Sequence, residues 1–401
     1  IQNERRHKDV PWPEGQQTKL QGLGQRKALP DFDPTDRRIL ELESEMNHLK
    51  QELRIERAKV KANSVKHGLF KAIKEEMEQT IEPVKPLPSA WKPSKNRGLI
   101  EEDLVMHVSD MHADEIVLPR EVGGLEEYDF NVCCRRAENY VDSTLRWSQE
   151  VLGDRFRFPK LWILSYGDQT SGEIHGAAQR SFYRNQFKNC FAIGTLQAKM
   201  IQELAPHFEQ VNVVSVPGNH GRRSKKKDYH GAHDNWDFLI AETANMLCRE
   251  IPNVNFLIPD SFSVNLVING VGFNISHGDD VGGSLGIPFY GMARRQKGLI
   301  ALNNMQGGPR IRYFVMGHHH VPASLADFDG EMIVNGAWVG TNAYAFNRFA
   351  GYREPAQWIH GVNQSHGITW RMSVGLKSDD ELNGPKRYII DGGRDVGPIL
   401  N

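Results

Sequence analysis

Short clusters of aspartate, asparagine and histidine recur along this chain, each directly after an apolar run. Imidazole nitrogens and carboxylate oxygens together suit divalent first-row metal ions. Clusters that are far apart in the sequence can form one site if they follow strands that end at the same edge of a sheet. The clusters are Asp110-Met111-His112, Gly167-Asp168, Gly218-Asn219-His220, His277-Gly278 and Gly317-His318-His319-His320.

The apolar runs before these clusters have the length and composition of buried strands. They lie at residues 104–108, 161–166, 211–216, 271–275 and 311–316. Glycines at positions 167, 218, 278 and 317 would let the backbone turn tightly where each strand ends. We therefore expect the five clusters to meet at one sheet edge.

A pair of divalent cations about 3.5–4 Å apart is suited to phosphoester hydrolysis. The cations neutralise the phosphate, hold it in line with the attacking group and lower the pKa of a shared water. The sequence therefore predicts a binuclear phosphoester hydrolase with two divalent metal ions. Mn²⁺ is the expected metal, and Fe, Zn²⁺ and Ni²⁺ are alternatives that the same donors accept.

The order of the clusters resembles the calcineurin-like metallophosphoesterase family, whose signature is Asp-x-His, Gly-Asp, Gly-Asn-His, a lone His and Gly-His-x-His. All five blocks stand in this order within about 210 residues, and the resemblance covers about residues 98–376. It implies an α/β fold, a four-layer α/β/β/α sandwich of two mixed sheets. It also implies attack on the phosphoester by a metal-bridging hydroxide.

The resemblance assigns metal ligands within these blocks. Asp168 would bridge the two ions. The first ion would take Asp110, His112 and His320. The second ion would take Asn219, His277 and His318.

Two of these blocks carry ligands at positions i and i+2. Side chains at these positions face the same way in an extended segment. We therefore expect His318 and His320 to face the metals while His319 points elsewhere, and the same for Asp110 and His112.

By the same resemblance, His220 is the catalytic residue that does not bind metal, and it would donate a proton or stabilise charge. The alternative is a histidine that only completes a turn. The family places carboxylates where this chain has Ser171 and Gly221, and those carboxylates orient the histidine. Asp228, Asp279 and Asp280 are the candidates to replace them.

Basic residues directly follow His220, and they could contact a polynucleotide or form a solvated loop. A second basic pair follows the stretch from Gly282-Gly283-Ser284 to Pro288-Phe289-Tyr290, which is expected to form a loop that caps the site. The candidate substrate-binding residues are Arg222, Arg223, Lys225, Lys226, Lys227, Arg294 and Arg295.

Three functions remain open on the sequence. The first is a nuclease that cleaves DNA or RNA, nearest to the double-strand-break repair branch of the family, with nucleic acid as its partner. The second is a small-substrate phosphatase or nucleotide phosphodiesterase. The third is a scaffolding protein with a residual site, which the complete ligand set disfavours.

Composition limits the class of protein. The 401 residues carry a net charge of −1 and are 39% apolar, so any affinity for nucleic acid must come from local basic patches. The four cysteines include no Cys-x-x-Cys pair, which predicts a reducing, cytoplasmic setting. No apolar run approaches the ~18 residues of a membrane span.

We expect four segments along the chain: a flexible arm at residues 1–36, a helical segment at 37–81, a Pro-rich linker at 82–97 and a metallophosphoesterase domain at 98–401. A heptad-like stripe predicts either a homodimeric coiled coil through residues 37–63 or one amphipathic helix on the chain's own domain. The stripe consists of Leu42, Met46, Leu49, Leu53 and Val60.

Further elements follow from periodicity and turn signals. Helices are predicted at residues 131–152, 177–208 and 234–249, and strands at 263–268, 332–335 and 367–374. Asn269-Gly270, between two alternating runs, predicts a tight hairpin.

Overall fold

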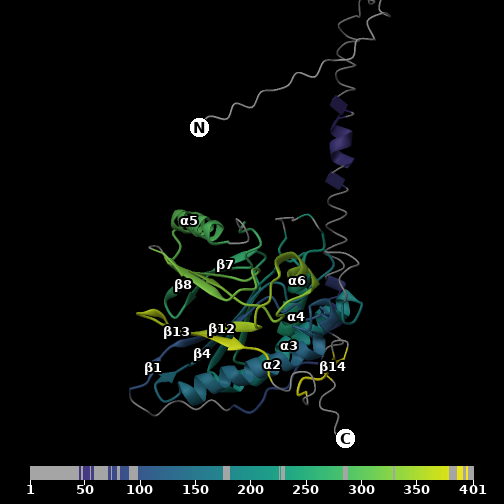
Figure 1. Ribbon diagram of the computed structural model, residues 1–401. Coiled ribbons are helices and arrows are strands. Elements are labelled where there is room, and N and C mark those ends of the chain that lie inside the picture. Colours follow the sequence, from purple (N-terminus) through teal and green to yellow (C-terminus); the bar gives the residue numbers. More distant parts are fainter. Residues whose placement is uncertain are drawn as a thin grey trace, which may run out of the picture. The chain divides into compact units, whose positions relative to one another are not determined.

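The chain divides into two units, residues 1–76 and residues 77–401, and the second unit contains all five metal-type clusters (Figure 1). In the first unit the computed structural model describes residues 45–46, 48–54, 56–57, 71–73 and 75–76. In the second it describes residues 77–78, 82–89, 98–174, 181–224, 226, 231–282, 288–327, 330–378, 386–391 and 394–395.

A six-stranded mixed sheet carries three of the clusters. Its strand order is β13-β12-β2-β4-β5-β6. The strands β2, β4, β5 and β6 are parallel, and β12 pairs antiparallel with both of its neighbours, β2 and β13. The predicted strands at 104–108, 161–166, 211–216 and 367–374 are confirmed. The bounds are β2 Asp103–Val108, β4 Lys160–Tyr166, β5 Gln210–Val216, β6 Val254–Leu257, β12 Ala356–Asn363 and β13 Gly367–Gly375.

A five-stranded mixed sheet carries the other two clusters, in the order β10-β11-β9-β8-β7. The hairpin between β7 and β8 is confirmed: Asn269 and Gly270 both have positive φ, 44° and 79°, as a two-residue turn of this type requires. The bounds are β7 Ser263–Ile268, β8 Val271–Ser276, β9 Ile311–Met316, β10 Ala323–Ala326 and β11 Glu331–Val334.

The two sheets pack face to face around one apolar core. Val105 and Leu164 of the six-stranded sheet contact the same cluster as Phe273, Ile275 and Val315 of the five-stranded sheet. All six residues of β2 and all six of β8 are buried. Strands that are covered on both faces have continuous apolar sequences. For this reason β2 and β8 could be predicted from the sequence.

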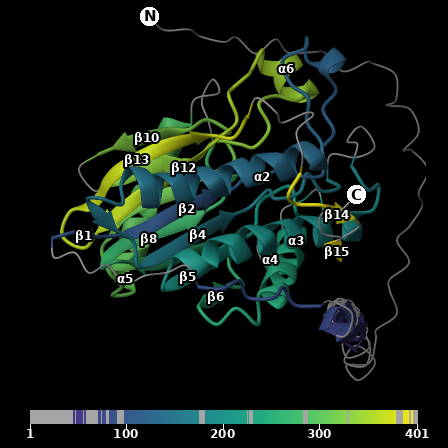
Figure 2. The same ribbon diagram turned by 90° about the horizontal axis from the view of Figure 1, so that it is seen from below.

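Helices cover the two outer faces, so the fold is the expected four-layer α/β/β/α sandwich (Figure 1), with α2, α3 and α4 on the face turned toward the reader in Figure 2. Three helices lie on the six-stranded sheet and one lies on the five-stranded sheet. Asparagine or aspartate caps the first three, accepting hydrogen bonds from the first turn. The bounds are α2 Phe130–Leu145, α3 Gln186–Leu204, α4 Trp236–Leu247 and α5 Phe289–Met305.

The loop expected to cap the site, residues 282–290, lies mostly outside the described residues. Its last two residues, Phe289 and Tyr290, belong to helix α5, which buries Met292 against Ile311 and Phe314 of β9. The exposed side of α5 is unusually apolar for a surface helix, and this obscured its helical period.

Smaller elements complete the second unit. These are β1 Ile100–Glu101, β3 Phe156–Arg157, β14 Ile390–Asp391, β15 Arg394–Asp395, the short helices η1 Pro119–Glu121, η2 Arg146–Val151 and η3 Ala205–His207, and helix α6 Ala343–Phe349.

The Pro-rich segment contacts the helices of its own unit. The backbone N–H of Val84 donates to the carbonyl of Leu247 at 2.9 Å, and Gln202 donates to the carbonyl of Lys85 at 2.6 Å. Met77 is also buried. The second unit therefore begins before the first strand of its sheets.

In the first unit, the described residues between 45 and 57 are helical, and Met46, Leu49 and Leu53 are exposed. Leu42 and Val60 of the same stripe lie outside the described residues. Among the residues described in both units, no helix has the length and apolar character that crossing a membrane requires.

Candidate metal centre

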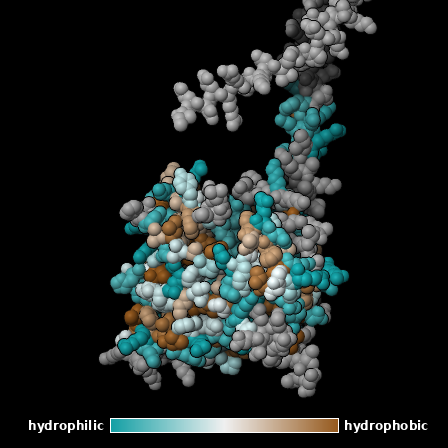
Figure 3. Space-filling model, viewed as in Figure 1, coloured by the Kyte–Doolittle hydropathy of each residue, from teal (hydrophilic) through white to brown (hydrophobic). Residues whose placement is uncertain are grey.

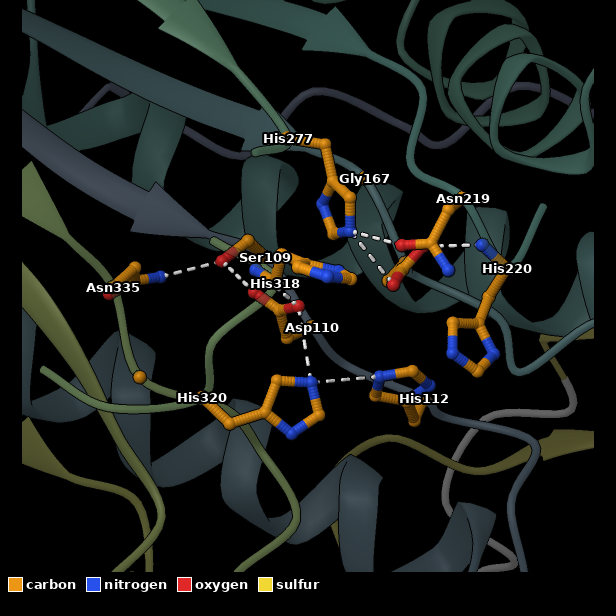
Figure 4. A network of polar contacts seen from close by, with 12 residues as sticks. Ser109, Asp110, His112, Gly167, Asn219, His220, His277, His318, His320 and Asn335 are labelled. Atoms are coloured by element: carbon orange, nitrogen blue, oxygen red, sulfur yellow. Dashed lines mark hydrogen bonds and ion pairs between the residues drawn. The ribbon is translucent and has the colours of Figure 1, made fainter. Parts of the chain in front are cut away.

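The loops that follow β2, β4, β5, β8 and β9 bring all seven expected ligands to one place. Figure 4 labels six of them, all except Asp168. Asp110, Asp168 and His277 are at most 1% exposed. Buried carboxylates and imidazoles are stable only when paired with each other or with a metal. The burial alone therefore marks this cluster as a site rather than a polar surface.

One group of ligand atoms belongs to Asp110, His112 and His320, and these atoms lie within 4.8 Å of one another. His320 Nε2 lies 3.3 Å from Asp110 Oδ1 and 3.3 Å from His112 Nε2. Two imidazole nitrogens at this distance share at most one proton. A cation between them would satisfy both.

A second group consists of Asp168, His277 and His318, again with ligand atoms within 4.8 Å. His277 Nε2 lies 2.9 Å from Asp168 Oδ2 and 3.0 Å from Asn219 Oδ1. The other ring nitrogen, Nδ1, lies 2.9 Å from the carbonyl of Tyr166. Because a carbonyl only accepts, Nδ1 carries the proton when the ring is neutral and Nε2 is left to bind a metal.

Asp168 connects the two groups, because its carboxylate also lies within 4.8 Å of ligand atoms of His112 and His220. One carboxylate that faces histidines from both sides has the position of a bridging ligand between two cations. The donor set, two carboxylates, four imidazoles and one amide oxygen, fits a pair of divalent ions.

The pKa values of the histidines in the cluster also favour a metal site. Burial opposes a charge on His277, but the Asp168 carboxylate prevails and raises the pKa of His277 to about 10. Burial and neighbouring histidines lower the pKa of His318 to about 3 and that of His112 well below its usual value. Two neutral imidazoles are thus ready to coordinate, and one proton on His277 occupies the place where a cation would stabilise Asp168.

The backbone at the ligands contradicts the expected extended geometry. Five ligands adopt the left-handed region, which residues other than glycine rarely occupy. The convergence of His318 with His320, and of Asp110 with His112, therefore comes from tight left-handed turns. Such strain concentrates at functional sites. The φ values are 53° for Asp110, 44° for His112, 53° for Asp168, 66° for His318 and 56° for His320.

A buried network holds Asp110 (Figure 4). Ser109 Oγ donates to Asp110 Oδ2 at 2.6 Å, and Asn335 Nδ2 donates to Ser109 Oγ at 3.0 Å and to Gln357 Oε1 at 2.6 Å. The other carboxylate oxygen, Oδ1, accepts the backbone N–H of His318 at 2.9 Å. These residues fix the orientation of one ligand through contacts that no short motif reveals.

Asp237, in the first turn of α4, ties two ligand loops together. Its carboxylate accepts backbone N–H groups from Asp168 at 3.0 Å, Gln169 at 3.0 Å and Gly218 at 2.8 Å. The only signal in the sequence is an acidic residue at the start of a helix, which is too common to assign a role.

Gly221 replaces the carboxylate that the resemblance leads one to expect after His220, and the structure gives a reason. A Cβ at position 221 would lie 2.0 Å from Asn235 Oδ1. The Asn235 side chain occupies this place because it donates to the Gly218 carbonyl at 2.9 Å and accepts from Asp237 N at 2.8 Å. Only glycine leaves room for this contact.

The ring of His220 lies edge-on to His112, with centroids 4.8 Å apart. Its Nδ1 lies 3.0 Å from the carbonyl of Ser171, and its backbone N–H donates to Asp168 Oδ1 at 2.8 Å. The backbone of Ser171 is itself fixed, because its N–H donates to buried Asp114 at 2.7 Å. A carbonyl thus orients the ring where the family uses a carboxylate.

Of the three suggested replacement carboxylates, Asp280 pairs with Arg295, and Asp228 lies outside the described residues. The charge of Asp279 acts on His277 and Arg295. That one of these carboxylates assists His220 therefore stays a prediction.

Among the basic residues, Arg222 contacts an expected ligand residue: its Nε donates to the carbonyl of Asn219 at 2.9 Å. Arg223 pairs with Asp234 at 2.9 Å, and Arg295 pairs with Asp280. Lys226 and Arg294 are exposed, while Lys225 and Lys227 lie outside the described residues.

Comparison with known proteins adds little. No profile of a known protein family matches this chain, and no curated protein matches it. A solved archaeal phosphodiesterase is 11% identical with a TM-score of 0.31 and covers 67% of this chain and 99% of its own. Wild-type Vps29 from Entamoeba histolytica, complexed with Zn²⁺, is 10% identical with a TM-score of 0.29, covering 68% and 99%. At such TM-scores these likenesses carry no weight for function.

Proposed function

We propose that this chain is a metal-dependent phosphoester hydrolase that uses two divalent cations, and that its substrate is a polynucleotide. The observation that supports the reaction class is the position of Asp168, which lies within ligand distance of two separate groups of histidines. A binuclear centre of nitrogen and oxygen ligands around one shared carboxylate is suited to phosphoester hydrolysis.

Seven residues would hold the metals. Asp110, His112 and His320 would bind the first ion, Asn219, His277 and His318 the second, and Asp168 both. When bound, such a pair neutralises phosphate charge and makes water nucleophilic near neutral pH.

His220 is the proposed catalytic acid. The carbonyl of Ser171 accepts a proton on Nδ1, so Nε2 is the nitrogen that we expect to exchange a proton with substrate. The ring stands beside His112 and Asp168, at the edge of the ligand cluster. A leaving oxygen bound there would take its proton from Nε2.

The polynucleotide part of the proposal is supported by the cations beside the centre. Arg222 is held against the carbonyl of the ligand Asn219, and exposed Lys226 follows in the same loop. Cations that flank a hydrolytic centre can bind the phosphates on either side of the one cleaved. A small-substrate phosphatase or nucleotide phosphodiesterase is the alternative.

A comparison of substrates tests both parts. Purified protein, chelated and then supplied with Mn²⁺, Zn²⁺ or Ni²⁺, should cleave single- or double-stranded DNA or RNA and also bis-p-nitrophenyl phosphate. Chelator should abolish every activity. Cleavage of p-nitrophenyl phosphate with intact polynucleotides would exclude the nuclease and leave the phosphatase. No hydrolysis with any metal would remove the enzymatic proposal.

A further inference from the structure

Helix α6 presents two aromatic side chains to solvent. Tyr344 is 68% exposed and Phe349 is 62% exposed, and their rings meet edge to face with centroids 5.6 Å apart. Hydrophobic side chains gather over α6 on this face of the molecule (Figure 3). Exposing two adjacent aromatic rings is unfavourable in water unless they have a partner.

The helix is rigidly anchored. The side chain of Asn342 caps it by accepting the N–H of Ala345 at 2.9 Å. Thr341 closes its base by donating to the carbonyl of Gly351 at 2.6 Å. The aromatic pair therefore stands on a fixed platform, and binding to it would cost little ordering of the protein.

The same anchors connect α6 to the candidate metal centre. Asn342 Nδ2 donates to Glu115 Oε1 at 3.0 Å, and Glu115 Oε2 lies 3.4 Å from Ser171 Oγ. Ser171 Oγ in turn lies 3.1 Å from Nδ1 of the ligand His112. Since Tyr344 is two residues beyond Asn342, the Cα atoms of these two residues lie within roughly 7 Å of each other.

Positive charge accompanies the aromatic rings. Arg348 on α6 is exposed and forms no ion pair with another described residue. Arg120 is exposed in η1, one turn before Gly123, where a Cβ would lie 3.3 Å from the ring of Phe346. Aromatic rings interleaved with cations are how proteins bind single-stranded nucleic acid without reading its sequence.

We propose that Tyr344 and Phe349 form a stacking platform for bases of a single-stranded polynucleotide whose backbone passes over the metal centre. This inference rests on the proposed function and specifies it further, because it assigns a substrate class, single-stranded DNA or RNA, to the same site. Arg348 binds a backbone phosphate beside the stacked base. A protein partner or a membrane surface would use the rings differently, and the test separates these.

The test compares two strands that differ only in their bases. One is a fluorescent oligothymidylate, and the other is an abasic strand with the same phosphates. In binding measured by anisotropy, the double variant Tyr344→Ala/Phe349→Ala should raise the Kd for oligothymidylate about 5- to 100-fold. The Kd for the abasic strand should change less than about 2-fold, and Tyr344→Phe should retain wild-type affinity, because it keeps the ring.

Val267→Ala is the matched control. Val267 is 46% exposed on β7, beside the β7–β8 hairpin, whereas His277 follows the other end of β8. Its replacement by alanine should leave both Kd values unchanged. An unchanged Kd in the double variant, or an equal loss on both strands, would overturn the platform. The platform would also be overturned if the double variant bound both strands with wild-type Kd values but had lost self-association or binding to lipid vesicles. Turnover of bis-p-nitrophenyl phosphate, measured in parallel, reports on the proposed function separately.

Discussion

The carboxylate of Asp237 accepts a hydrogen bond from the backbone N–H of Asp168 at 3.0 Å. The same carboxylate accepts the N–H of Gly218 at 2.8 Å, so one side chain from α4 fixes two ligand loops that follow neighbouring strands. Burial, together with the nearby charge of Asp168, raises the pKa of Asp237 to about 6. The loops thus keep their strained shape through a contact outside every metal-binding motif.

We predict that Asp237→Asn will weaken the hydrogen bonds that residue 237 accepts from the backbone of Asp168 and Gly218. The amide retains one acceptor but turns its NH₂ group toward backbone N–H donors, which leaves at least one of them unsatisfied. We expect a loss of about 1–3 kcal/mol in the free energy of unfolding by urea and a roughly 10- to 100-fold loss in metal affinity or kcat/KM. Asp142→Asn, on the exposed face of α2, is the control. Equal stability and activity in both variants would show that these hydrogen bonds are dispensable.

Replacing the shared ligand should have a larger effect. Asp168→Asn removes the charge that pairs with His277 and that faces both histidine groups. Turnover should fall by about 10³-fold or more, because the metals supply several kcal/mol of transition-state stabilisation. Elemental analysis should find that both equivalents of metal are lost together. Retention of one full equivalent would mean that Asp168 binds a single ion.

His220→Ala should separate chemistry from metal binding. The ring is held by the carbonyl of Ser171, and its loss removes no expected metal ligand. The metal content should stay at the wild-type level while kcat falls by roughly 10²–10⁴-fold, the usual contribution of a general acid. The defect should shrink on a substrate whose leaving group needs no proton, such as bis-p-nitrophenyl phosphate. A variant that loses metal instead would make His220 a ligand.

The sequence predicts some features of this molecule and not others for physical reasons. Strands such as β2 and β8 are buried on both faces, so their apolar runs and the ligands at their ends were visible locally. Ser109 and Asn335 are 226 positions apart, and no pattern within one segment connects them. The left-handed turns at Asp110 and His318 were missed because polar strand ends permit extended and turned backbones alike.

Stability should depend on pH through Glu102, which is 1% exposed and accepts hydrogen bonds from Thr369 at 2.8 Å and Trp370 at 3.1 Å. Burial outweighs these bonds and raises its pKa above the ordinary 4.5. Between pH 4.5 and the folded-state pKa of Glu102, the folded protein therefore keeps a proton that the unfolded chain has lost. This contribution to stability is complete below pH 4.5 and disappears as the pH rises through the folded-state pKa.

Glu102→Gln removes this titration. Urea unfolding at several pH values should give wild-type and variant curves that diverge across that window, with the variant relatively more stable on the alkaline side. Parallel curves would show that the Glu102 carboxyl titrates at the same pH in the folded and unfolded chain.

The first unit should determine the oligomeric state. Met46, Leu49 and Leu53 lie on described helical residues and are exposed, and a second copy of the stripe is the partner that a heptad pattern favours. A chain that begins at Met77, which keeps Met77 and Val84 against their own unit, should sediment as a monomer, whereas the full chain should sediment as a dimer. The variant Leu49→Lys/Leu53→Lys should shift the full chain to monomer as well.

The truncated chain and the full chain should turn over bis-p-nitrophenyl phosphate at the same kcat/KM, because the expected ligands come from one chain. A dimer that persists after residues 1–76 are removed would place the interface in the second unit.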